Sequence, residues 1–170
     1  DTAGNAGPSA TTANFTIDTT SPTVSSFTMS DTDLKSGDTS TVTIVFSEAV
    51  AGFANSDVTV VNGALATMTS SDNITWTGTY TPTADVEDAT NVLTLATSYT
   101  DTAGNAGPSA TTANFTIDTK APTVSSFTMS DTALKSGDTS TVTIVFSESV
   151  AGFSNSDVTV VNGALAKMTS

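Results

Sequence analysis

Residues 39–47 read Thr-Ser-Thr-Val-Thr-Ile-Val-Phe-Ser, and this stretch decides the fold class. Its apolar residues Val42, Ile44 and Phe46 alternate with threonine and valine. Strict alternation places every second side chain on the same face of an extended strand, whereas a helix requires a period near 3.6 residues. Threonine and valine are also β-branched and therefore favour strands. The stretch predicts a strand with one buried face.

The same alternation continues outward from this stretch, and no segment shows a helical stripe. Asn62-Gly63 stands between two apolar runs and predicts a tight type I′ hairpin. Phe46, Trp76 and Phe115 fall on the apolar faces of their strands, which makes them candidate core residues. Seven short antiparallel strands in about 100 residues are typical of an immunoglobulin-like β-sandwich. The expected strands are residues 24–29, 39–47, 57–61, 64–69, 73–81, 91–99 and 110–117.

The chain contains a long internal repeat, because residues 1–70 recur as residues 101–170. A repeat of this length is a whole domain copied in tandem rather than a short solenoid unit. We therefore expect the C-terminal part of a preceding repeat in residues 1–19, a complete repeat in residues 20–119 and the N-terminal half of the next in residues 120–170. The copies differ only at Thr20/Lys120, Ser21/Ala121, Asp33/Ala133, Ala49/Ser149, Ala54/Ser154 and Thr67/Lys167.

The composition argues against several classes of function. The chain has 17 acidic residues, four lysines and a net charge of −13, which disfavours nucleic-acid and anionic-membrane partners. It has no His, Cys or Arg, so an enzyme would lack the usual bases and nucleophiles. Tandem copying gives length to a spacer and avidity to a binder, but adds little to a catalytic domain. No stretch approaches the roughly 20 apolar residues of a membrane-spanning helix, so we expect no membrane insertion in this segment.

Following the strands in alternating directions places five oxygen-bearing side chains at the end where the chain enters the sandwich. They are Asp18, Glu48, Asp57, Asp101 and Asn105. Carboxylate and amide oxygens are ligands that Ca²⁺ prefers. The run Asp101-Thr-Ala-Gly-Asn105 suits such a site, because its glycine permits a tight turn. The alternative stays open, since Asp and Asn favour loops for turn chemistry alone.

The opposite end carries acidic residues too, in the predicted loops around residues 31–38 and 85–88. In a tandem array this end would meet the entry end of the next repeat, so acid would face acid at every junction. Bound Ca²⁺ would replace that repulsion with ligation. The full set of candidate ligands is Asp18, Glu48, Asp101 and Asn105, their copies Asp118, Glu148, Asp1 and Asn5, and the less specific Asp31, Asp131, Asp57 and Asp88.

Several runs of the sequence resemble bacterial immunoglobulin-like repeats. They are Leu34-Lys-Ser-Gly-Asp-Thr, Val42-Thr-Ile-Val-Phe-Ser-Glu, Val50-Ala-Gly-Phe, Asp57-Val-Thr-Val-Val-Asn-Gly and Tyr99-Thr-Asp-Thr-Ala-Gly-Asn. Such repeats form the extender regions of giant Ca²⁺-dependent adhesins of the RTX type, which Gram-negative bacteria secrete. The resemblance covers the whole repeat and implies junction-bound Ca²⁺. The ligands that it implies are Asp18, Glu48, Asp101 and Asn105 with their copies.

The residues and the resemblance together predict a non-enzymatic extender module of a secreted adhesin, located at the bacterial cell surface and used in adhesion and biofilm formation. Its partners would be the neighbouring repeats of the same chain, while other domains would bind the adhesion target. The alternative is an immunoglobulin-like module that binds glycan or protein through its polar loops. The loops hardly differ between the two copies, which favours the spacer.

Overall fold

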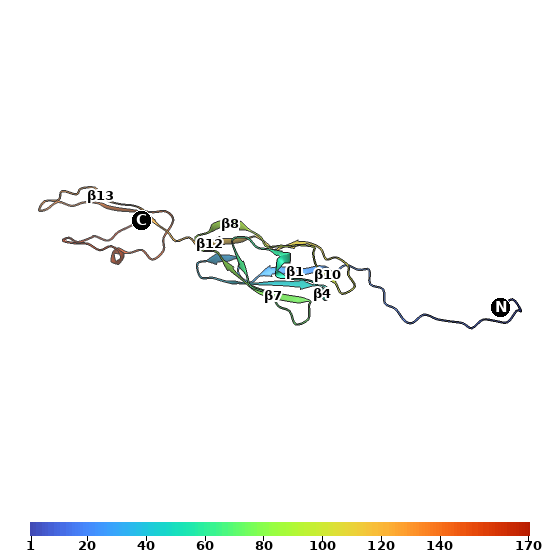
Figure 1. The fold of residues 1–170 in the computed structure, drawn as a ribbon. Helices are drawn as coiled ribbons and strands as arrows, with labels where there is room; N and C mark the ends of the chain where they lie inside the picture. Colours follow the sequence, from blue (N-terminus) through green and yellow to red (C-terminus); the bar gives the residue numbers. More distant parts are fainter. The chain divides into compact units, whose positions relative to one another are not determined.

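The stretch at residues 39–47 forms a central strand of a four-stranded sheet in the computed structural model, which describes all of residues 1–170 (Figure 1). All pairs in this sheet are antiparallel. The register places Ile44 opposite both Phe27 and Trp76, so these three side chains share the face turned to the core. In spatial order the strands are β1 (Val24–Met29), β3 (Ser40–Phe46), β7 (Thr75–Pro82) and β6 (Gly63–Leu65).

A second layer faces this sheet and consists of shorter strands. One part contains β5 (Val58–Thr59), β9 (Thr94–Leu95) and β11 (Ala110–Thr111), and the other contains β2 (Asp33–Lys35), β12 (Phe115–Asp118) and β8 (Glu87–Asn91). β8 and β9 follow each other along the chain, as do β11 and β12, so the two parts are continuous. A separate pair is formed by β4 (Val50–Ala51) and β10 (Thr100–Asp101).

The two layers enclose one core of apolar side chains, which confirms the predicted β-sandwich. Phe46 is 2 % exposed and lies against Phe53 and Tyr99, with ring centroids 5.8 Å and 4.9 Å away. Phe115 is also buried, at 1 % exposed. Trp76 is half-buried and packs against this core. The three aromatic residues predicted for the core therefore all contribute to it.

The hairpin predicted at Asn62-Gly63 is wrong. β5 before the turn pairs with β9, whereas β6 after it pairs with β7, so the turn carries the chain from one layer to the other. A type I′ turn needs positive φ at both central residues, but only Asn62, with φ +49°, has it. Gly63 is required for another reason, because the ring of Tyr80 occupies the space of a Cβ atom at this position.

The acidic loops predicted opposite the entry end are partly strands. Glu87 and Asp88 belong to β8, which ends at Asn91, and β9 covers only Thr94–Leu95 of the strand expected at residues 91–99. Asp33 belongs to β2, which pairs with β12 in parallel, so the prediction of a purely antiparallel sandwich is wrong for this pair. Polar side chains dominate both β2 and β8, so no apolar alternation marks them in the sequence.

The chain enters and leaves the sandwich at opposite ends. At the entry end Ser47, just after β3, donates its N–H to the Thr23 carbonyl at 2.9 Å, just before β1. At the exit end Thr119, just after β12, donates its N–H to the Val86 carbonyl at 2.8 Å. Figure 1 shows β4 and β10 at the entry end, and β8 and β12 at the exit end.

The chain divides into two compact units, Asp1–Thr119 and Lys120–Ser170. In the second unit β13 (Val124–Met129) and β14 (Val142–Phe146) pair in the register of β1 and β3. Phe127 is 58 % exposed there, whereas its copy Phe27 is 7 % exposed. Short 3₁₀ turns recur in both units as η1 (Asn55–Asp57) and η2 (Asn155–Asp157), and no helix has the length and apolar character to span a bilayer.

Candidate metal centre

The loop of residues 101–105 at the entry end is closed by the side chain of Asp101. Its Oδ1 accepts hydrogen bonds from two main-chain N–H groups of the loop, both at 2.8 Å, and its Oδ2 accepts one from Asn105 Nδ2 at 2.7 Å. The copies Asp1 and Asn5 form the same set of bonds at 2.9–3.0 Å, although they are exposed. The loop is therefore formed by its own five residues, independently of the sandwich.

Asp101 combines burial with ionisation. Its side chain is 1 % exposed, yet its pKa lies below the ordinary value. The hydrogen bond from the Asn105 side chain is the main cause, the main-chain N–H groups of the loop add to it, and burial acts in the opposite direction. Asp101 is therefore a carboxylate at neutral pH, which is the form that binds a cation.

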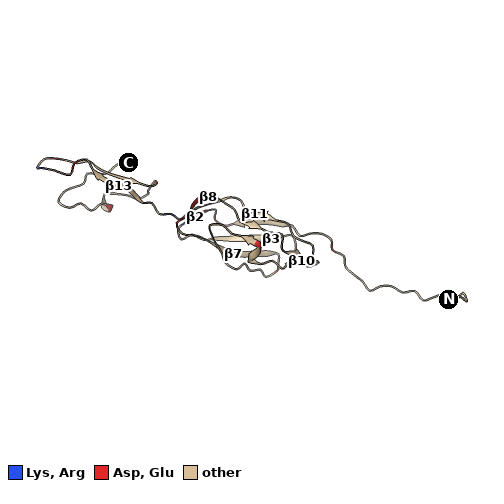
Figure 2. Cartoon of the chain, turned by 45° about the horizontal axis from the view of Figure 1, so that its top comes forward, with Lys and Arg blue, Asp and Glu red and all other residues tan.

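Three carboxylates meet at the entry end, those of Asp18, Glu48 and Asp101. One oxygen of each lies within 4.8 Å of the others. Glu48 follows β3 and Asp101 ends β10, whereas Asp18 belongs to the segment before the sandwich. Three like charges at this spacing repel one another unless a cation lies between them. We call this group the entry cluster; Figure 2 marks the acidic residues in red.

Asn105 links the entry cluster to the main chain of the entering segment. Its Nδ2 lies 3.3 Å from the Asp18 carbonyl oxygen and 3.2 Å from the Thr20 carbonyl oxygen, in addition to its bond to Asp101. Sequence reasoning missed these two carbonyl oxygens, because no side-chain pattern shows which main-chain groups of a linker turn towards a site. They add two further oxygens to the surroundings of the cluster.

The donor set of the entry cluster fits Ca²⁺. Ligand oxygens lie roughly 2.3–2.6 Å from this ion, so two ligands of one ion are at most about 5 Å apart. The separation limit of 4.8 Å among the three carboxylates meets this condition. The donors at the cluster are carboxylate oxygens with main-chain carbonyl oxygens nearby, and neither His nor Cys is present to favour zinc or copper. The residues can therefore hold a hard cation.

Asp57 lies outside the entry cluster, although it was expected at the same end. It is 6 % exposed, and its Oδ2 accepts the Ala54 N–H at 2.8 Å while its Oδ1 accepts the Ser98 hydroxyl. Its copy Asp157 accepts the Ser154 N–H in the same way, at 2.8 Å. Asp57 thus holds the η1 turn closed, which is a structural role.

The carboxylates of the candidates at the exit end also accept hydrogen bonds from the protein itself. Asp31 and its copy Asp131 accept the N–H two residues further along, at 3.0 Å and 2.9 Å. Asp88 accepts the Thr90 N–H at 2.9 Å and Asn62 Nδ2 at 2.8 Å. Turn chemistry accounts for Asp31 and Asp131, Asp88 holds a distant segment through Asn62, and none of the three joins a group of three carboxylates.

The remaining candidates are copies of the cluster residues. Asp118 ends β12 in the first unit, whereas Glu148 follows β14 in the second and is exposed. Asp1 and Asn5 form the exposed loop already described. Within the first unit, the structure therefore brings together Asp18, Glu48, Asp101 and Asn105.

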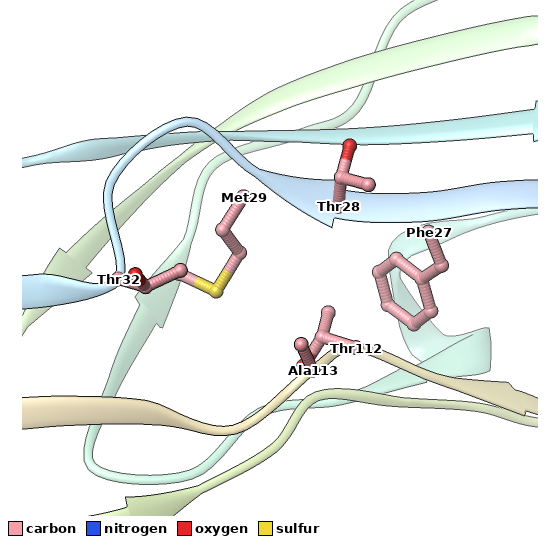
Figure 3. A pocket seen from close by; sticks show the side chains of 6 residues that line it. All are labelled: Phe27, Thr28, Met29, Thr32, Thr112 and Ala113. Atoms are coloured by element: carbon pink, nitrogen blue, oxygen red, sulfur yellow. The ribbon is translucent and has the colours of Figure 1, made fainter.

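A shallow hollow of about 110 Å³ lies elsewhere in the first unit (Figure 3). It is lined by Phe27, Thr28, Met29, Thr32, Thr112 and Ala113. Small-molecule sites are usually about 300–1,000 Å³ and combine apolar walls with convergent polar groups. The hollow is smaller and has no charged side chain, so it gives no support to the ligand-binding alternative.

Comparison with known proteins adds the family. A family model described as a bacterial Ig-like domain matches residues 18–117 and, a second time, residues 118–170. The two matches begin at Asp18 and Asp118, which are equivalent positions of the repeat. No curated protein and no solved structure matches the chain.

Proposed function

Because the chain belongs to the bacterial immunoglobulin-like domain family, we propose that it is a surface-protein module and, within that class, an extender segment in the stalk of a secreted bacterial adhesin. In this role it holds a distal ligand-binding domain away from the cell surface. Ca²⁺ at the junctions between repeats stiffens the stalk. One observation carries the proposal: the entry cluster combines one carboxylate from the entering segment with two carboxylates from the sandwich.

A cation in the entry cluster would tie the entering segment to the sandwich. Asn105 already holds the main chain of Asp18 and Thr20 by hydrogen bonds. Without a cation, the carboxylate of Asp18 is repelled by those of Glu48 and Asp101. With the cation, the same three groups become ligands of one ion. The ion therefore acts on the freedom of the linker more than on the sandwich itself.

The linker between the two units is short, which supports a stalk. Thr119 is held in the first unit by its bond to Val86, and Thr123 is held in the second by a 2.9 Å bond from its N–H to Ser147 Oγ. Only residues 120–122 lie between these anchors, and the last of them is a proline with a restricted φ. Such a linker allows less bending than a glycine- and serine-rich chain.

The test of Ca²⁺ binding is thermal unfolding of residues 1–170 in Ca²⁺, in Mg²⁺ and in EGTA. Ca²⁺ should raise the Tm, because a ligand of the folded state adds about 2.7 kcal/mol of stability at a concentration 100 times its Kd. Asp18→Asn and Glu48→Gln should each reduce the shift. Asp85→Asn is the matched control, because it removes a carboxylate outside the cluster at a residue with φ +58°, which asparagine tolerates.

An unchanged Tm of the unmodified chain in Ca²⁺ would refute the Ca²⁺ part of the proposal. Stiffening is a separate claim, and small-angle scattering of a tandem array of several repeats measures it. The largest dimension of the array should increase when Ca²⁺ replaces EGTA. An array that is equally extended in both would overturn the stiffening role even if the ion binds.

A further inference from the structure

We infer that the parallel pair of β2 and β12 is a mechanical clamp, which resists unfolding when the chain is pulled from both sides of the first unit. The premise that the chain is pulled at all comes from the proposed stalk function. The clamp consists of the register pairs Asp33↔Thr116, Leu34↔Ile117 and Lys35↔Asp118. It has no counterpart elsewhere in the molecule, because every other strand pair is antiparallel.

The direction of load follows from the topology. β1 begins at the entry end, and β2 continues in the same direction only three residues after β1 ends. β12 runs towards the exit end and stops at Asp118, just before the linker. Tension on the linkers therefore pulls β2 back towards the entry end and β12 forwards towards the exit end. β2 and β12 are the strands of the two loaded ends that pair with each other directly.

Parallel pairing converts this tension into shear. When parallel strands are pulled from opposite ends, they must slide along each other, so all hydrogen bonds between them bear the load together. When both strands are pulled from the same end, the bonds open one after another and each bears the load alone. Forced unfolding is governed by the unfolding rate, so the first arrangement unfolds at the higher force.

Side chains strengthen the clamp at its centre and on its surface. Leu34 and Ile117 are 0 % and 1 % exposed, so sliding the strands would pull two core side chains out of place. Thr116 donates its N–H to the Thr32 carbonyl at 2.9 Å and its Oγ1–H to Asp33 Oδ1 at 2.9 Å. The clamp therefore couples buried packing to hydrogen bonds that cross from one loaded strand to the other.

One of the six differences between the copies falls on this clamp. The second copy has Ala133 at the position of Asp33, and alanine offers no acceptor for a threonine hydroxyl. The other two clamp residues of β2, Leu34 and Lys35, are identical in both copies. Neighbouring repeats would thus share the clamp but differ in one of its cross-strand bonds, and Asp33→Ala reproduces the natural difference.

Force spectroscopy of the whole chain tests the clamp directly. The chain contains no cysteine, so attachment points can be chosen by single Cys substitutions. Thr20→Cys with Lys120→Cys loads the clamp in shear, whereas Ser36→Cys with Lys120→Cys peels it from its exit end, and all three positions are exposed. The unfolding force should be about twofold higher in the first geometry. Equal forces, or a higher force on peeling, would overturn the inference.

A pair of variants tests the cross-strand bonds in the shear geometry. Thr116→Val and Asp33→Ala should each raise the unfolding rate at constant force about fivefold, as expected for loss of one hydrogen bond. Thr79→Val, at an exposed position of β7 outside the clamp, should leave the rate unchanged. Equal effects of Thr116→Val and Thr79→Val would count against the clamp.

All pulling measurements are made in EGTA, which separates this inference from the proposed function. A higher unfolding force in the shear geometry in EGTA, together with a Tm that does not change with Ca²⁺, would support the clamp and reject the metal site. A Ca²⁺-dependent Tm with no difference between the two pulling geometries would retain the metal and reject the clamp. If Thr116→Val does not fold, the comparison of geometries still decides, because it leaves every clamp residue unchanged.

Discussion

The ring of Tyr99 occupies the space that a Cβ atom on Gly107 would need, and the Tyr99 hydroxyl donates a 2.7 Å hydrogen bond to the Pro108 carbonyl oxygen. Tyr80 repeats this arrangement at the connection before β6. Its ring lies over Gly63, and its hydroxyl donates a 2.8 Å bond to the Val61 carbonyl. Each tyrosine therefore pins a connecting segment to the core through one glycine and one carbonyl.

Gly107→Ala should destabilise the chain, because the added methyl group collides with the buried Tyr99 ring. Overpacking of this kind typically costs about 1–3 kcal/mol. Urea denaturation of residues 1–170 measures the free energy of unfolding. Gly7→Ala is the matched control, since Gly7 is the copy of Gly107 in the exposed segment and has no neighbour within 4 Å. Similar losses for both variants would contradict the packing explanation.

Alkaline pH should unfold the chain through the same two tyrosines. Burial raises the pKa of Tyr80 to about 12, and burial together with the nearby Asp57 charge raises the pKa of Tyr99 to about 12, from an ordinary value of 10.0. The folded state thus favours the neutral phenols. The contribution of the two neutral phenols to the free energy of unfolding is therefore fully present below pH 10. It is lost as pH rises from 10 towards 12.

Ultraviolet titration of tyrosinate checks this prediction, because the chain contains only these two tyrosines. In the folded chain the absorbance change should be centred well above pH 10, and in urea it should return to the ordinary value of 10.0. A folded chain that titrates at the ordinary value would show that the rings are not buried as described.

Acid pH should act through Asp101. The hydrogen bond from the Asn105 side chain is the first cause that lowers the pKa of Asp101 below the ordinary value of 3.8. A lowered pKa stabilises the folded state above pH 3.8, and this contribution is lost as pH falls through the folded value. Asn105→Ala should therefore move the Asp101 titration upward, which carboxyl-carbon NMR measures. An unchanged titration would mean that the main-chain N–H groups alone hold the carboxylate.

The layers of the sandwich were predictable because burial of one sheet face imposes alternation. Strand β1 matches the predicted residues 24–29, and β3 lies within residues 39–47. Strand β8 was not predictable, since Glu-Asp-Ala-Thr-Asn carries no apolar alternation. The hairpin prediction at Asn62-Gly63 failed for a different reason. Gly63 is needed because the Tyr80 ring leaves no room for a Cβ atom, and not because its φ is positive. Contacts between segments distant in the chain leave no such local trace.

The candidate site also has a part that the sequence predicts and a part that it does not. The convergence of Asp18, Glu48 and Asp101 was predictable, because strand directions determine which loops share an end of a sandwich. Asp57 has the same origin, yet its carboxylate turns to Ser98 and the η1 turn. Strand direction places a residue at an end of the sandwich, but packing determines where its side chain points. The sequence alone cannot separate a ligand from a turn-closing carboxylate on that basis.

Asp57→Ala should therefore behave differently from changes in the entry cluster. It leaves the Ala54 N–H and the Ser98 hydroxyl without their acceptor in a buried setting, which typically costs about 1–3 kcal/mol. The loss should be the same in Ca²⁺ and in EGTA, because no cluster oxygen is removed. Glu48→Gln should instead lower stability in Ca²⁺, because its side chain is a proposed ligand, and should slightly raise stability in EGTA, because it removes one of the three repelling carboxylates.

Urea denaturation of both variants under the two conditions makes the comparison. Asp57→Asn is a useful intermediate, because an amide retains one acceptor oxygen for the Ser98 hydroxyl or the Ala54 N–H and should lose less stability than alanine. A loss for Asp57→Ala that appears only in Ca²⁺ would return Asp57 to the set of metal ligands. A Ca²⁺-independent loss for Glu48→Gln would remove Glu48 from that set.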